Sequence, residues 1–205
     1  MDDNDDKIII GEDTKYPIEV TAYAFKGTVD TTIEHNIRFA KEMIETEKGT
    51  IPVLFVYTKD KMFVVPLNTK LASDTKSSPA DQVVPLLKVF KSNEDKTGKV
   101  VGYQVMFEAW MGRTNKKESE KLLKNYKFGD IGKLDQRVDA LLSVVNLNKK
   151  EVKTEIYEIR KLESDKKITL KKLDAKEFGM PVANPKFPDF KDVKGDYWCG
   201  SQTIM

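Results

Sequence analysis

The run from Lys99 to Met111 constrains the fold most, because it is long, almost free of charge and regular in its alternation. Its sequence is KVVGYQVMFEAWM. Successive side chains of a strand point to opposite faces. One face would carry Val101, Tyr103, Val105, Phe107 and Ala109, and the other Val100, Gly102, Gln104, Met106, Glu108 and Trp110. Since both faces are mostly apolar, the run is predicted to be the central strand of a sheet that is covered on both sides.

Shorter runs with the same character predict the other strands of the sheet. They lie at residues 16–25, 51–57, 62–67, 137–145, 151–160 and 168–173. The second and third of these runs, and the fourth and fifth, are separated by short polar turns, which predicts two hairpins. With two helices between the strands, the pattern predicts an α+β fold: an antiparallel sheet of five to seven strands, in the order (β)αββαβββ.

Two segments have the spacing of an amphipathic helix. The first begins at residues 31–34, where Thr-Thr-Ile-Glu has the form of a capping box, and Gly49 suits its end. The second begins at the Ser-Pro pair of residues 78–79. Pro85 either kinks this second helix or moves its start to about Val84.

A length of 205 residues suits one domain with extensions. Residues 1–13 are predicted to be an acidic N-terminal arm, in which residues 8–10 (Ile-Ile-Ile) can pair as an edge strand in this chain or on a neighbour. Residues 14–174 are predicted to form a single domain, with a charged excursion at 112–136. Residues 175–205 are predicted to be an extended arm, because proline and glycine oppose regular structure while aromatic residues oppose a free linker.

The charge and cysteine content exclude several classes of protein. A net charge of +2 provides no overall attraction to nucleic acid or to anionic lipid. Cys199 is the only cysteine, so no disulfide can form within the chain. The acidic start and the absence of a long apolar run predict neither a signal peptide nor a membrane span. We therefore expect a cytoplasmic protein, or one inside a particle assembled there, without membrane contact.

The sequence contains none of the common catalytic or cofactor-binding motifs. It has no Gly-x-Ser-x-Gly elbow, no glycine-rich phosphate loop and no calcium loop. His35, the only histidine, is predicted to lie beside Arg38 on the exposed side of the first helix. The sequence therefore predicts no cofactor, no metal and no catalytic residue, and it favours a protein that is not an enzyme.

Four residues form a candidate cluster of buried ionisable groups. Glu108 and Asp139 lie in apolar strands, where burial would disturb their ionisation unless a cation met them, and Arg113 or Arg137 could be that cation. Such a cluster either fixes the fold as an ion pair or lines the pocket of an enzyme or regulator that binds a small molecule.

The lysines of residues 112–136 offer a second alternative, which is nucleic-acid binding. Acidic residues dilute this strip, so a solvated loop is the favoured interpretation.

The segment from Ile37 to Arg160 carries the runs VMFEAWM, RVDALLSVVN and TEIYEIRK. In these runs the chain resembles small uncharacterised proteins of bacterial and phage genomes, which share an "EAWM" strand and a following R-x-[DE]-A-L strand. The resemblance implies a fold unit and no activity. The order of elements is also similar to that of roadblock and longin-type modules, which are dimerising platforms.

These observations favour a non-enzymatic structural or adaptor protein that acts through protein–protein contacts, such as a virion or phage-derived component. Its partners would be other copies of itself or neighbours in an assembly. The aromatic residues of the C-terminal arm are the candidate contacts: Phe178, Phe187, Phe190, Tyr197 and Trp198.

Overall fold

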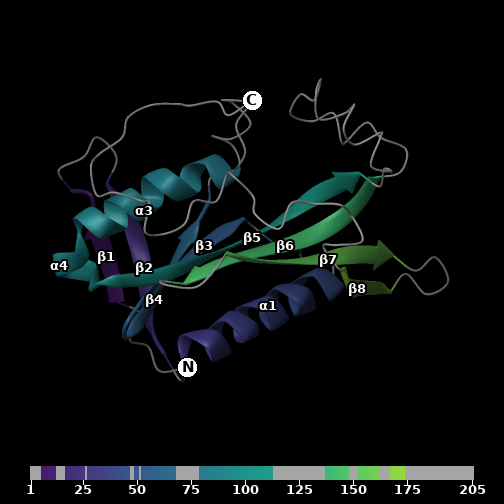
Figure 1. The fold of residues 1–205 in the computed structure, drawn as a ribbon, viewed down its shortest axis with the longest axis horizontal. Coiled ribbons are helices and arrows are strands. Elements are labelled where there is room, and N and C mark those ends of the chain that lie inside the picture. The colour runs from purple at the N-terminus through teal and green to yellow at the C-terminus, as the bar shows by residue number, and fades with distance from the viewer. Residues whose placement is uncertain are drawn as a thin grey trace.

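The computed structural model describes residues 6–12, 17–25, 27–46, 49–50, 52–67, 79–112, 137–147, 152–161 and 167–173. These residues form one eight-stranded antiparallel sheet with helices on both faces, which confirms the predicted α+β class (Figure 1). The predicted excursion, apart from its first residue, and the predicted C-terminal arm lie outside the described residues.

The strands follow one another across the sheet in the order β1-β2-β4-β3-β5-β6-β7-β8. Their bounds are β1 Asp6–Ile10, β2 Ile18–Ala24, β3 Val53–Thr58, β4 Lys61–Pro66, β5 Val100–Gly112, β6 Arg137–Leu147, β7 Lys153–Lys161 and β8 Ile168–Leu173. The predicted count of five to seven strands was too low, because the run at residues 8–10 pairs with β2 of its own chain, Ile8 opposite Val20. Both predicted hairpins, β3–β4 and β6–β7, are confirmed.

β5 is an inner strand, between β3 and β6, as predicted for the run that contains it. Its alternation shifts at one point that the sequence does not reveal. Tyr57 pairs with Gly102 while Thr58 pairs with Val100, so β5 has a bulge at Val101. The bulge brings Val100 onto the same face as Tyr103, whereas strict alternation predicted opposite faces.

Helix α1, Val29–Glu45, begins before the predicted capping box. Thr28 is the N-cap: its hydroxyl accepts from the Thr31 backbone N–H at 3.2 Å, and the Thr31 hydroxyl accepts from the Thr28 N–H at 3.0 Å. A threonine at the third helical position therefore replaces the expected glutamate. Gly49, with φ of 65°, follows the helix end as predicted.

The second predicted helix is split in two. A 3-10 turn, η1 (Pro79–Gln82), leads into α3 (Val83–Ser92), and a short helix, α4 (Glu94–Thr97), follows. Pro85 is the third residue of α3, where the backbone N–H has no partner within the helix. The later of the two predicted starts is therefore correct, and Pro85 causes no kink.

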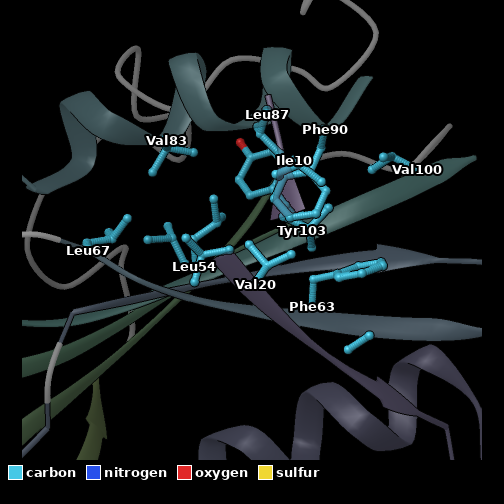
Figure 2. Close-up of a cluster of buried hydrophobic side chains, with 14 of the residues drawn as sticks. Ile10, Val20, Leu54, Phe63, Leu67, Val83, Leu87, Phe90, Val100 and Tyr103 are labelled. Atoms are coloured by element: carbon cyan, nitrogen blue, oxygen red, sulfur yellow. The ribbon is translucent and has the colours of Figure 1, made fainter. Parts of the chain in front are cut away.

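The two long helices cover opposite faces of the sheet (Figure 1). Figure 2 shows Leu87 and Phe90 of α3 packed over Ile10, Phe63 and Tyr103. The Phe63 and Phe90 rings are 5.3 Å apart. On the other face, α1 buries a second cluster against β3 and β5–β8. This cluster contains Ile33, Ile37, Ala40, Ile44, Tyr57, Met106, Leu141, Val145, Tyr157 and Ile168.

Candidate functional site

The predicted cluster of buried ionisable residues does not form as expected. Glu108 and Asp139 are both exposed. Glu108 turns toward the segment after α1, where its carboxylate accepts from the Thr50 backbone N–H at 2.6 Å and from the Thr50 hydroxyl at 3.0 Å. The prediction of burial was wrong: both carboxyl side chains are exposed, and α1, the described helix on this face, ends at Glu45. Arg113 and the side chain of Arg137 lie outside what the structure describes.

A buried polar network, which we did not predict from the sequence, fixes α1 on the sheet. The Tyr57 hydroxyl donates to Gln104 Oε1 at 2.6 Å, and Asn36 Nδ2 donates to the same oxygen at 3.1 Å. Gln104 Nε2 donates to Ser143 Oγ at 3.0 Å. Burial raises the pKa of Tyr57, which keeps its hydroxyl protonated. Asn36, Gln104 and Ser143 each place a polar group among apolar residues of a helix stripe or strand, and this was the available signal in the sequence.

Three large apolar side chains are exposed on the α1 side of the described structure, two of them on β1 and β2 at one edge of the sheet. The three large apolar side chains with the greatest exposure in the described chain are Ile9 (47% exposed), Tyr23 (37%) and Phe39 (56%). By register, Tyr23 of β2 lies beside Met62 of β4, which lies beside Tyr57 under α1. Ile9 of β1 lies beside Glu19 of β2, four residues before Tyr23. Ile9 and Tyr23 therefore share the face that α1 packs against.

Phe39 belongs to the same side of the molecule. It follows Asn36 by one turn of α1, and Asn36 Nδ2 is 3.4 Å from Met62 Sδ, so this flank of the helix looks toward β4 and β2. We call Ile9, Tyr23 and Phe39 the apolar patch. No described helix covers its β1 and β2 residues.

A groove of about 700 Å³ lies along the opposite flank of α1, between the helix and β6–β8. Its apolar part consists of Ile33, Ile37, Val145 and Leu147. Its polar part consists of Asp30, Glu34, Arg38, Lys41, Lys153, Glu155, Tyr157 and Lys172.

Glu155 is the centre of the polar part of the groove. One carboxylate oxygen accepts from Lys172 Nζ at 2.7 Å and lies 3.0 Å from Lys153 Nζ, and the other accepts from the Tyr157 hydroxyl at 2.7 Å. Burial by itself would raise the pKa of Glu155, but the hydrogen bonds from Lys172, Tyr157 and Lys153 outweigh it and lower the pKa to about 2. Burial and the Glu155 carboxylate raise the pKa of Tyr157.

Lys41 completes this cluster from the helix. Its Nζ lies 3.9 Å from the centroid of the Tyr157 ring, the geometry of a cation–π contact. Burial lowers the pKa of Lys41, with a further lowering by the charge of Lys172. The sequence did not reveal the cluster, because Lys153, Glu155, Tyr157 and Lys172 read there only as ordinary residues of two strands.

Three further predictions concern the histidine, metal binding and the membrane. His35 is exposed and its Nδ1 lies 3.0 Å from Arg38 Nη2, as predicted. In the described part of the chain, no group of three or more His, Cys, Asp and Glu side chains is placed to hold a metal ion. No helix described in the structure has the length and apolarity needed to cross a membrane. The five aromatic candidates of the C-terminal arm, Cys199 and the lysines of 113–136 lie outside the described residues.

Comparison with known proteins does not add to this geometry. No family model, curated protein or solved structure matches the chain.

Proposed function

We propose that this protein is a non-enzymatic structural or adaptor protein that acts by binding another protein chain, and that this chain is a second copy of itself. The observation that carries the proposal is the apolar patch: the three large apolar side chains with the greatest exposure lie on one side of the described structure. Exposed apolar side chains that gather on one side mark protein interfaces more often than scattered ones do.

The edge of the sheet supports the same surface. Among the described strands, β1 is the terminal one of the sheet, and it contributes Ile9 to the patch. The outer edge of a terminal strand offers backbone N–H and C=O groups to a further strand. Joining β1 to β1 of a second copy would extend the antiparallel sheet and bring the patches of both copies to one interface.

The charges near the patch favour a second copy as the partner. On the face that carries Ile9, Lys7 Nζ and Glu19 Oε1 form an exposed ion pair at 2.7 Å. A two-fold interface brings a surface against itself, so a surface that carries one charge of each sign can satisfy both in the dimer. A patch of one charge sign would instead repel its copy.

The test is the mass of the full-length protein in solution, measured by size-exclusion chromatography with light scattering over a wide dilution series. We expect a dimer or larger assembly for the unchanged chain. Ile9→Glu and Tyr23→Glu place a charge in the interface, so each should weaken association about tenfold or more, which corresponds to about 1.4 kcal/mol.

Thr169→Glu is the matched control, because it changes the charge by the same single unit at a partly exposed position of β8, opposite Arg160 and at the other edge of the sheet. It should leave the mass unchanged. A monomer at every concentration, or association equally sensitive to Thr169→Glu and Tyr23→Glu, would overturn the proposal.

A further inference from the structure

The groove between α1 and β6–β8 contains more positive than negative charge at one end. Lys41, Lys153 and Lys172 surround the carboxylate of Glu155, and Glu45, one turn further along α1, also acts on Lys41, which leaves a surplus of one positive charge. Glu155 already accepts from Lys172 and Tyr157 and pairs with Lys153. It therefore has little capacity left to bind the Lys41 ammonium.

Lys41 has donors that the described chain does not use. Its close partner there is the face of the Tyr157 ring, and among the described residues no hydrogen-bond acceptor or carboxylate lies within bonding distance of its Nζ. A ring face attracts the ammonium but does not saturate its three N–H groups. The half-buried ammonium is therefore available to an anion in the groove.

The acidic lining residues lie at a different level of the helix. Glu34 precedes Lys41 by seven residues, and Asp30 precedes Glu34 by four. At about 1.5 Å per residue, Glu34 and Lys41 are separated by about 10 Å along the axis. Ile33 and Ile37 of α1, with Val145 and Leu147 of β6, form the apolar part of the groove. The groove thus combines an apolar wall with one cationic end.

From this arrangement we infer that the groove binds a small organic anion with an apolar body. The apolar body lies against Ile37, Val145 and Leu147, and a carboxylate or phosphate head accepts hydrogen bonds from Lys41, with Lys153 and Lys172 beside it. Hydrogen bonds between two charged groups are stronger than those between neutral groups. Water competes less for them where the lysine is partly buried.

This inference is independent of the proposed self-association. Phe39 of the apolar patch and Lys41 of the groove lie on different flanks of α1, since residues two apart on a helix do not share a face. Failure of one proposal therefore leaves the other standing.

Two amphipathic probes, octyl phosphate and octanoate, test the inference on the full-length protein by isothermal titration calorimetry. We expect at least one of them to bind about tenfold or more tightly than inorganic phosphate and than octanol. This result requires both the charged head and the apolar body. The tighter of the two probes identifies the preferred head group.

Variants then locate the site. Lys41→Gln should weaken the tighter probe about tenfold or more, while circular dichroism shows an unchanged fold. Lys153→Gln should weaken it less, because the Lys153 side chain is largely exposed and already pairs with Glu155. Lys171→Gln is the matched control, because it removes an equivalent charge from the opposite face of β8 and should have no effect.

Three results would overturn the inference: no binding of either probe, equal binding of octanol, or equal loss of affinity in Lys41→Gln and Lys171→Gln.

Discussion

Two glutamates of the sheet, Glu108 and Glu155, differ in what lies around each carboxylate. Glu108, in an apolar run, ends exposed against Thr50. Glu155, in a strand of mixed composition, ends buried with partners on both oxygens. Whether a carboxylate is buried depends on the helix that packs over it and on its neighbours in adjacent strands. Neither can be seen in the sequence of the strand that carries the carboxylate.

The lowered pKa of Glu155 predicts a specific dependence of stability on pH. Because the pKa is about 2 in the folded protein against an ordinary 4.5, ionised Glu155 stabilises the fold above pH 4.5. This contribution is lost as the pH falls from 4.5 toward 2. Glu155→Gln should remove it, with a loss of at most about 3 kcal/mol at neutral pH, since one pKa unit corresponds to about 1.4 kcal/mol.

The measurement is chemical denaturation of both proteins between pH 2 and pH 7. Glu42→Gln, at an exposed position of α1, is the control and should keep the pH dependence of the unchanged chain. A pH dependence that survives Glu155→Gln in full would contradict the assignment.

The candidate sites were the least predictable part of the molecule. Lys41 and Tyr157 are 116 positions apart in the sequence and meet only because α1 packs across the sheet. The sequence drew attention to charged residues with apolar neighbours along the chain, such as Glu108. It could not show residues such as Lys41 and Tyr157, whose contacts come from other elements.

At the scale of elements, the close approach of β5 and β6 depends on one glycine. A Cβ built on Gly102 would lie 2.5 Å from the Asn146 carbonyl oxygen and 2.9 Å from the Leu147 Cα. Both are backbone atoms, which cannot move without distorting the pairing of the two strands. Gly102→Ala should therefore destabilise the protein by about 1–3 kcal/mol, as over-packing of a core does.

Gly49→Ala provides the comparison for this variant. Among the described residues, its Cβ would meet only the Glu108 carboxylate, at 3.6 Å, but the residue has a φ of 65°. Its cost, about 1 kcal/mol, should come from the backbone conformation alone. Thermal denaturation of the two variants separates crowding from backbone strain, and a Gly102→Ala variant as stable as the unchanged chain would contradict the described register.

The sequence predicted the elements themselves well, since periodicity is a local property. Strand β5, both hairpins and the later start of α3 agree with it. The bulge at Val101 and the start of α1 at Val29 were not predicted. In both cases the local sequence allows more than one conformation, and contacts with other elements select one of them. Threonines at positions 28 and 31 can each begin a helix, and packing against the sheet selects between them.

The described residues form three buried apolar clusters, and the two largest lie on opposite faces of the sheet. Ile44 lies in the core under α1 and Leu87 in the core under α3, so Ile44→Ala and Leu87→Ala should each cost about 2–5 kcal/mol. Because the two sites share no partner, the losses should add in the double variant.

Since all strands belong to one sheet, guanidinium denaturation followed by circular dichroism and by fluorescence should show one coincident transition. Separate transitions for the two signals would contradict this view.

The strand order also has a consequence for the newly made chain. Five of the seven neighbouring pairs in the sheet join strands that are consecutive in sequence, and the other two, β2–β4 and β3–β5, skip only one strand. After the β3–β4 hairpin has joined β2 through β4, β5 pairs with β3, and β6, β7 and β8 each pair with the strand before them. The sheet can therefore grow from β1 toward β8 in the order in which a ribosome delivers it, without waiting for the C-terminal residues.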